Sequence, residues 1–289
     1  MTSITAAPAI GVVGAGVMGL GIAEIAARAG CRVTVLESFP SALETAPVRL
    51  EASLARSVKS GRLLEDPADV VRRIVFTSDP STLADVVLVV EAIRESVEDK
   101  VALIEILDGV LTDECIIATN TSSIPVARLA SASRVPGRVI GLHFFNPATT
   151  MPLVEVVPSL LTDSATTDAA MAFAGQTLGK QAVLAPDRSG FLVNAILVPY
   201  LLSAIRALEN GVATREDIDT GMVGGCGMPM GPLKLCDMIG LDTMLLVSES
   251  LYAEHLEAAF APPALLRRHV DAGWLGRKNG RGFYDYSAA

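Results

Sequence analysis

The residue best suited to proton transfer in this sequence is His143. An imidazole takes up and releases protons near neutral pH, which makes histidine a common general acid or base. The chain has three histidines, and His143 ends an apolar run and precedes a loop that contains Pro147. His255 and His269 lie among charged residues in segments with helical spacing, where we expect surface positions. His143 is therefore the candidate acid/base.

A carboxylate that could assist His143 is Glu155, an isolated acid in the apolar run 153–157. A carboxylate beside an imidazole orients the ring and stabilises its protonated form. Burial of an unpaired carboxylate is costly, so a buried Glu155 should have a partner. The pattern favours a His143–Glu155 pair. The alternative is an acid at the edge of a sheet without a functional role.

A second group of residues is suited to bind a phosphorylated cofactor. The apolar run 10–13 ends in the motif Gly14-Ala15-Gly16-Val17-Met18-Gly19, and a helical stretch rich in small residues follows. A GxGxxG motif between a strand and a helix is typical of a dinucleotide-binding βαβ unit, whose helix N-terminus binds the pyrophosphate. The expected cofactor contacts in this motif are Gly14, Gly16, Val17, Met18 and Gly19.

The acid Glu37 indicates which dinucleotide is bound. It closes a second apolar run, 32–36, at the place where an acid binds the 2′-hydroxyl of the adenosine ribose, about 20 residues after the glycines. No Arg or Lys follows at once, so a 2′-phosphate would meet an unneutralised carboxylate. We therefore expect NAD as the cofactor and not NADP. The alternative is that Glu37 only ends a strand.

The pattern of apolar runs predicts a doubly wound, Rossmann-type α/β sheet. Continuous apolar runs fit parallel strands covered by helices on both faces, and ligand groups gather at the carboxyl ends of such strands. The further expected strands are 74–76, 86–90, 115–119, 139–142 and 153–157, with a charged helix at 95–111 between the second and third of them. Five candidates follow expected strands, namely Gly14, Glu37, Glu91, Ser122 and His143.

From about residue 187 onward only helical periodicity remains. We expect an NAD-binding Rossmann domain over 1–187 and an all-α C-terminal domain over 188–289. The expected helices of the second domain are 191–208, 214–223, 231–236, 241–258 and 262–272. The first of these is apolar almost all round, which suits a core or a subunit interface.

The Rossmann pattern is interrupted by a helical excursion at about 40–73, with expected breaks near Pro47 and at 60–61. Arg49, Arg56 and Lys59 share roughly one face of it. They form either a solvated helix face or a basic surface for a phosphorylated ligand.

Composition excludes several classes of function. The formal net charge of −9 argues against a nucleic-acid partner, which needs a basic face. The four cysteines lack a CxxC spacing and are interpreted as reduced core thiols, without a metal site or disulfide framework. The longest apolar stretch, 191–205, is interrupted and too short to span a bilayer, and no basic secretory leader is present. We therefore expect a cytoplasmic protein that does not bind membranes.

Six further motifs occur in an order that resembles one family. They are Asn120-Thr121-Ser122-Ser123, His143-Phe144-Phe145-Asn146-Pro147, Leu153-Val154-Glu155-Val156, Gly190-Phe191-Leu192-Val193-Asn194, Pro229-Met230-Gly231-Pro232 and Gly282-Phe283-Tyr284-Asp285-Tyr286. With the glycine motif they resemble the L-3-hydroxyacyl-CoA dehydrogenases, especially the short bacterial 3-hydroxybutyryl-CoA dehydrogenases. The resemblance extends from about residue 9 to residue 286.

The resemblance implies NAD-linked interconversion of an L-3-hydroxyacyl-CoA, of short chain in the members that this sequence most resembles, and a 3-ketoacyl-CoA. It makes His143 the acid/base and Glu155 its orienting partner, while Ser122 and Asn194 bind the C3 oxygen or thioester carbonyl of the substrate. Glu91, Lys100, Asn120 and Ser122 would lie near the cofactor. Arg49, Arg56 and Lys59 as a group would lie against the phosphates of CoA. A homodimer through the helical C-terminal domain is also implied.

The departures from the family pattern lower the basicity around the substrate. Pro152 stands where many members have Lys, and Ser189 and Ala195 replace a common Pro and Arg. A relative that acts on hydroxyacyl groups tethered to an acyl carrier protein therefore remains an alternative. A sugar-acid dehydrogenase and a non-catalytic NAD-binding protein are further alternatives, the latter disfavoured because Ser122, His143, Glu155 and Asn194 are all present.

Overall fold

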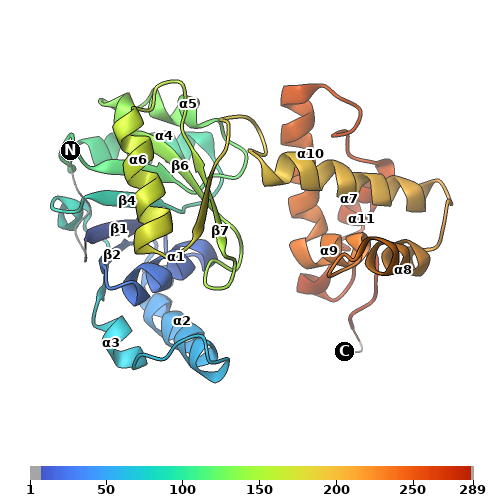
Figure 1. Ribbon diagram of the computed structural model, residues 1–289, viewed down its shortest axis with the longest axis horizontal. Coiled ribbons are helices and arrows are strands. Elements are labelled where there is room, and N and C mark those ends of the chain that lie inside the picture. The colour runs from blue at the N-terminus through green and yellow to red at the C-terminus, as the bar shows by residue number, and fades with distance from the viewer. Residues whose placement is uncertain (1–7, 288–289) are drawn as a thin grey trace. The chain divides into compact units, whose positions relative to one another are not determined.

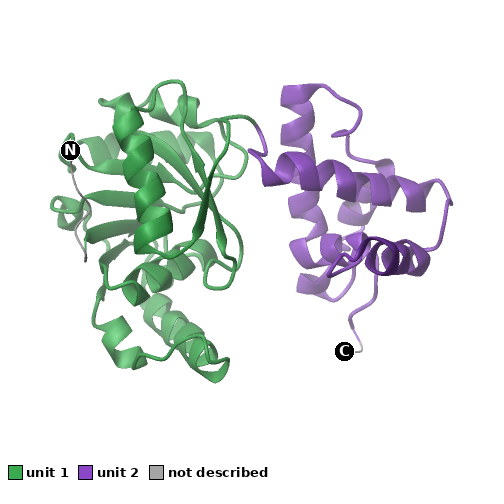
Figure 2. Ribbon diagram, viewed as in Figure 1, with its two compact units in different colours: residues 1–188 green, residues 189–289 purple. Residues whose placement is uncertain are grey.

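The computed structural model describes residues 8–287 of the chain, and it divides into two compact units (Figure 1). The first ends at Arg188 and the second begins at Ser189, as Figure 2 shows in green and purple. The first unit is built around one sheet, whereas the second consists of helices.

The sheet of the first unit has eight strands in the order β3-β2-β1-β4-β5-β6-β7-β8. The strands are β1 (Ala9–Val13), β2 (Arg32–Leu36), β3 (Ile74–Thr77), β4 (Leu88–Glu91), β5 (Ile116–Thr119), β6 (Val139–Phe144), β7 (Leu153–Val157) and β8 (Gln181–Leu184). The order reverses between β1 and β4, which is the switch point where doubly wound sheets bind ligands. The Rossmann-type fold is thus confirmed.

The last two strands differ from the predicted parallel pattern. β7 runs antiparallel to β6, and β8 then pairs parallel with β7. Neither β8 nor the helix before it, α6 (Ser164–Ala172), followed from the sequence pattern. α6 is rich in Ser, Thr and Ala and lacks a clear apolar stripe, and β8 is a half-exposed edge strand.

Helices cover both faces of the sheet. The helical elements of this unit are α1 (Val17–Arg28), α2 (Pro40–Lys59), α3 (Pro67–Val71), η1 (Pro80–Leu83), α4 (Val97–Asp108), α5 (Val126–Ala130), η2 (Pro136–Arg138), α6 and the π-helical turn η3 (Phe173–Thr177). Side chains alternate along each strand, so Ile116 and Ala118 of β5 pack with α1, α2 and α6 whereas Ile117 packs with α4 and α5. Both strand faces are buried, which explains the continuous apolar runs.

The helical excursion lies on the α1 side of the sheet. α2 is continuous through Pro47, so the expected break near that residue is wrong, whereas the helix does end at Lys59, just before Gly61 at φ +69°. A proline removes one backbone hydrogen bond without always ending a helix, and the buried side chains Ala46, Leu50 and Leu54 still pack against the core.

The second unit is all-α, as predicted. Its elements are α7 (Val193–Glu209), α8 (Arg215–Cys226), α9 (Pro232–Ile239), α10 (Leu241–His255), α11 (Ala264–Asp271) and the 3-10 turn η4 (Arg277–Asn279). The buried face of α7, including Leu201 and Ile205, packs against α9, α10 and α11. His255 and His269 are half-buried rather than at the surface: His255 stacks on Phe260, and His269 packs against aromatic rings.

All four cysteines are free thiols, but they are not all in the core. Burial raises the pKa of Cys31 to about 11 and that of Cys115 to about 12, and it also raises the pKa of Cys236. Cys226 at the end of α8 is exposed, which corrects its assignment to the core.

Residues 8–287 lack two kinds of feature, a membrane-spanning helix and a metal cluster. Within that range no helix combines the length and apolar character needed to cross a bilayer. In the same range no group of three or more His, Cys, Asp and Glu side chains is placed to hold a metal ion.

Candidate active site

The pairing of β6 with β7 sets the His143–Glu155 geometry. The two residues are direct partners in the antiparallel register, so their side chains leave the sheet side by side. His143 Nδ1 lies 2.7 Å from Glu155 Oε2, with His143 4% exposed and Glu155 0% exposed. A carboxylate oxygen accepts hydrogen bonds, so Nδ1 is the donor and Nε2 is the ring nitrogen on the side away from Glu155.

Ser122 reaches the other side of the same ring. It follows β5 in the loop before α5, and its Oγ lies 3.0 Å from Nε2 of His143. Since β5 and β6 are neighbouring parallel strands, their carboxyl ends bring Ser122 and His143 to one edge of the sheet. The line Glu155–His143–Ser122 thus runs from a buried carboxylate to a half-buried hydroxyl.

The two asparagines among the candidate site residues lie in different units. Asn120, in the first unit, accepts a hydrogen bond from the backbone N–H of Phe144 through Oδ1 at 2.9 Å and so fixes the chain next to His143. Asn194, in the second unit, is the second residue of α7 and is half-buried.

The glycine motif fits a dinucleotide. Gly14 has φ +101°, and a Cβ at Gly19 would collide with the carbonyl oxygen of Gly14, so the turn and the close packing of α1 need these glycines. Gly16 has open space around the Cβ position, and as the N-cap of α1 it offers no side chain to the helix N–H groups. Those N–H groups are suited to bind a phosphate. Glu37 braces the loop, since its Oε2 accepts from Ala15 N at 2.8 Å.

Glu91 at the carboxyl end of β4 and Lys100 of α4 are almost inaccessible to solvent, at 2% and 1% exposed. Lys100 Nζ lies 2.6 Å from Glu91 Oε1, and the same carboxylate accepts from Thr119 Oγ1 at 2.6 Å and from Ile93 N at 2.8 Å. The pair ties β4 to β5 below the cofactor edge.

The helical excursion contributes to a cavity of about 550 Å³ in the first unit. Its walls are α1, α2, Arg62 and the loop 146–150, and Arg49 and Arg56 line it. Arg49 also donates to the carbonyl oxygen of Ala15 at 2.9 Å. Lys59 is exposed and is not part of the wall, whereas Arg62, which the helical spacing did not single out, is.

Comparison with known proteins identifies the family. A family model described as 3-hydroxyacyl-CoA dehydrogenase, NAD binding domain, matches residues 9–188, and one described as 3-hydroxyacyl-CoA dehydrogenase, C-terminal domain, matches residues 190–286. The chain belongs to the 3-hydroxyacyl-CoA dehydrogenase family. It is therefore an oxidoreductase that uses NAD.

Relatives of this dehydrogenase match it over nearly its whole length. The 3-hydroxybutyryl-CoA dehydrogenase of Mycobacterium tuberculosis is 49% identical over 279 residues, which are 96% of this chain and 98% of that protein. The crystal structure of M. tuberculosis FadB2 has a TM-score of 0.95 at 48% identity and covers 98% of this chain and 100% of its own. That of the (S)-3-hydroxybutyryl-CoA dehydrogenase PaaH1 from Ralstonia eutropha has a TM-score of 0.93 at 41% identity, with 97% and 99% covered.

One charged group next to the Ser122 loop did not follow from the sequence. Glu95 fell inside the expected helix 95–111, but α4 begins only at Val97, with Ser96 as its N-cap. The Oγ of Ser96 accepts from Asp99 N at 3.3 Å. A Ser three residues before an Asp is a helix-start signal, and it would have placed Glu95 outside the helix, after β4.

Proposed function

We propose that this dehydrogenase interconverts a short-chain L-3-hydroxyacyl-CoA, such as 3-hydroxybutyryl-CoA, and the corresponding 3-ketoacyl-CoA. The observation that carries the proposal is the line of contacts from Glu155 through His143 to Ser122, at 2.7 and 3.0 Å. It lies at the same sheet edge as the glycine motif that fits a dinucleotide.

In the oxidative direction, Nε2 of His143 takes the proton of the C3 hydroxyl as the C3 hydride leaves the substrate. NAD⁺, when bound, supplies the hydride acceptor. The Glu155 carboxylate stabilises the imidazolium that forms. Ser122 and Asn194 donate hydrogen bonds to the C3 oxygen or thioester carbonyl and so stabilise the developing charge. In the reductive direction, His143 returns the proton to the C3 oxygen.

The proposal assigns the cofactor contacts to the sheet edge. Gly14, Gly16, Gly19 and the first N–H groups of α1, at Val17 and Met18, bind the pyrophosphate, and Glu37 binds the adenosine ribose. Asn120 and Ser122 border the nicotinamide end. Glu91 and Lys100 support this edge from below, in keeping with their burial.

The cavity beside α2 is the proposed site for the phosphates of CoA. Arg49, Arg56 and Arg62 line it in a chain whose net charge is −9, so it concentrates positive charge. Lys59 lies on the same helix and contributes to the field at a greater distance.

A homodimer through the second unit is part of the proposal. A groove of about 420 Å³ between α7 and α8 is lined by Tyr200, small residues such as Ala204 and Ala207, and Met222. Ile196 on α7 is 68% exposed, which leaves an apolar face for the same helices of a second copy. The free thiols fit a reducing compartment, so we propose that the dimer is cytoplasmic.

The test is the loss of NADH absorbance with acetoacetyl-CoA, beside a longer 3-ketoacyl-CoA, the same acyl group on an acyl carrier protein, and NADPH. We expect turnover with NADH and acetoacetyl-CoA that exceeds each of the other arms. Turnover with the carrier-protein substrate alone would show that the acyl group is presented on an acyl carrier protein and not on CoA. NADH binding without turnover in any arm would contradict the proposal and favour a non-catalytic or different hydroxy-acid-binding role.

A further inference from the structure

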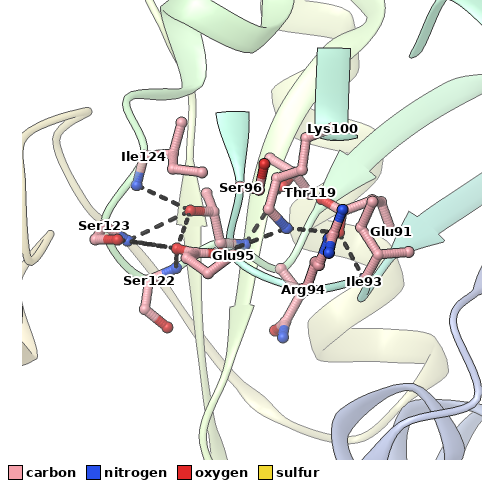
Figure 3. A network of polar contacts seen from close by, with 12 residues as sticks. Glu91, Ile93, Arg94, Glu95, Ser96, Lys100, Thr119, Ser122, Ser123 and Ile124 are labelled. Atoms are coloured by element: carbon pink, nitrogen blue, oxygen red, sulfur yellow. Dashed lines mark hydrogen bonds and ion pairs between the residues drawn. The ribbon is translucent and has the colours of Figure 1, made fainter. Parts of the chain in front are cut away.

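The loop that presents Ser122 to His143 is held by a side chain from a different strand end. Glu95, in the segment between β4 and α4, extends its carboxylate toward Ser122 and Ser123 (Figure 3). Its Oε1 accepts from Thr121 Oγ1 at 2.6 Å, from the Ser122 and Ser123 backbone N–H groups at 2.9 and 3.1 Å, and from Ser123 Oγ at 3.0 Å. Four donors thus converge on one oxygen.

This convergence favours negative charge on the oxygen. A neutral acid or amide oxygen is a weaker acceptor than a carboxylate oxygen, because hydrogen bonds to ionised groups are the stronger ones. Lys100 lies behind it, with Nζ 3.4 Å from Glu95 Oε2. Burial alone would raise the pKa of the Glu95 carboxyl, but Lys100 and the hydrogen bonds from Thr121, Ser122 and Ser123 together hold it below its usual range.

The loop is also fixed at its two ends, where Asn120 accepts from Phe144 N and Ile124 packs in the core. Residues 120–125 separate β5 from α5 and belong to no regular element. Within the loop, Thr121 Oγ1, which donates to Glu95, accepts from Ile124 N at 2.9 Å. The backbone position of Ser122 sets where its side chain starts, and its hydroxyl lies 3.0 Å from Nε2 of His143.

We infer that Glu95 is a positioning residue: its carboxylate fixes the backbone of Ser122 and thereby holds the Ser122 hydroxyl against His143. The inference rests on the proposed roles of Ser122 and His143. It assigns to Glu95 an effect on turnover that passes through Ser122 and not through the stability of the fold.

The decisive experiment is a double-mutant cycle with Glu95→Gln and Ser122→Ala, with kcat measured at saturating NADH and acetoacetyl-CoA. We expect Glu95→Gln to lower kcat by about 10- to 100-fold in the wild-type background, the size of effect that loss of one positioned group has, with a smaller change in KM. On the Ser122→Ala background the same substitution should lower kcat by less than about threefold, because residues that act as a unit are not additive. An equal loss on both backgrounds would overturn the inference.

Two further variants keep the cycle interpretable. Glu98→Gln removes a neighbouring exposed acid of α4, whose carboxylate accepts from Ser96 Oγ at 3.1 Å, and it should leave kcat unchanged. Ser123→Ala removes one of the four donors and should lower kcat by only about two- to fivefold, which keeps the test informative if Glu95→Gln does not fold.

A readout without turnover separates this inference from the proposed function. Amide hydrogen exchange at residues 121–124 and the ¹⁵N chemical shifts of the His143 ring report the loop and its contact in the NAD-free protein. We expect faster exchange and shifted ring signals in Glu95→Gln but not in Glu98→Gln. If the wild type does not reduce any 3-ketoacyl thioester, the proposed function fails while these measurements still decide the role of Glu95. Unchanged exchange and ring signals overturn that role even in an active enzyme.

Discussion

Both units use a side-chain carboxylate to hold a backbone segment that lacks regular structure; that of Glu95 is partly exposed, whereas that of Asp237 is buried. In the first unit Glu95 accepts the N–H groups of Ser122 and Ser123. In the second unit Asp237 of α9 accepts the N–H groups of Phe283 and Tyr284, at 2.8 and 2.9 Å. The same kind of contact thus holds the Ser122 loop in one unit and the C-terminal segment in the other.

The two carboxylates differ in what balances their charge. Lys100 and several donors bring the pKa of Glu95 below its usual range, although partial desolvation of the carboxyl opposes this. At Asp237 burial raises the pKa, and the bonds from Tyr284, Phe283 and Tyr286, together with His269, offset this only in part. The comparison shows what a nearby lysine does: the Glu95 carboxylate, with Lys100 behind it, is stabilised in its ionised form. The Asp237 carboxylate has no such lysine among the causes of its shift, and burial makes its ionised form less favourable.

The largest expected effect tests whether activity resides in the first unit. We expect His143→Ala to lower kcat by about 10²- to 10⁴-fold, the usual contribution of a general acid/base, while NADH binding stays close to wild type. Steady-state kinetics and calorimetric titration measure this. His255→Asn in the second unit serves as a control that keeps its turnover, and near-wild-type turnover of His143→Ala would remove it from the acid/base role.

The next effect tests whether Asp237 acts on stability alone. We expect Asp237→Asn to lower the free energy of unfolding by about 1–3 kcal/mol, because an amide supplies one acceptor oxygen where the carboxylate supplies two. Turnover per folded molecule should be unchanged. Denaturant unfolding beside Asp271→Asn, an exposed acid of α11, measures the difference. A loss of kcat without a loss of stability would contradict the comparison.

A pH series sharpens the contrast, because the two pKa shifts have opposite signs. The folded pKa of Glu95 is lowered, so its stabilisation is present above the ordinary value of 4.5 and is lost as pH falls through the folded value. The folded pKa of Asp237 is raised above 3.8, so the wild type gains stability as pH falls from the folded value toward 3.8.

Unfolding free energies from about pH 7 to about pH 4 should therefore diverge between the two variants. The difference between wild type and Glu95→Gln should narrow below the ordinary pKa of a glutamate. The difference between wild type and Asp237→Asn should widen. If the two differences in unfolding free energy changed with pH in the same direction, the pKa shifts of Glu95 and Asp237 would have the same sign, which would contradict the comparison.

The smallest effect concerns the cofactor edge of the first unit. Glu37→Ala removes the carboxylate that would repel a 2′-phosphate, and we expect the preference for NADH over NADPH in kcat/KM to narrow by roughly tenfold. Because Glu37 also accepts from Ala15 N, Glu37→Gln provides the variant that keeps an oxygen there. An unchanged ratio in both variants would exclude Glu37 from cofactor selection.

Much of the fold followed from the sequence because its signals are local. Apolar runs and glycine spacing predict β1, β2 and the strand ends that carry Ser122 and His143. The direction of β7 depends on pairing across the sheet, so the opposition of His143 and Glu155 was a chemical hypothesis without a geometric basis. Glu95 was hidden because apolar periodicity places helix boundaries poorly and its partners lie 26 to 28 residues away.

The antiparallel pairing of β6 with β7 has a consequence for engineering. The pairing alone keeps His143 opposite Glu155, whereas the loop 146–150 between the strands forms a wall of the arginine-lined cavity. Lys180 clamps this loop from outside, since its Nζ donates to the carbonyl oxygens of Ala148 and Met151 at 2.8 and 2.7 Å. The loop and the two strands can therefore be changed separately: a loop exchanged between relatives would alter the cavity wall, while the strands keep His143 opposite Glu155.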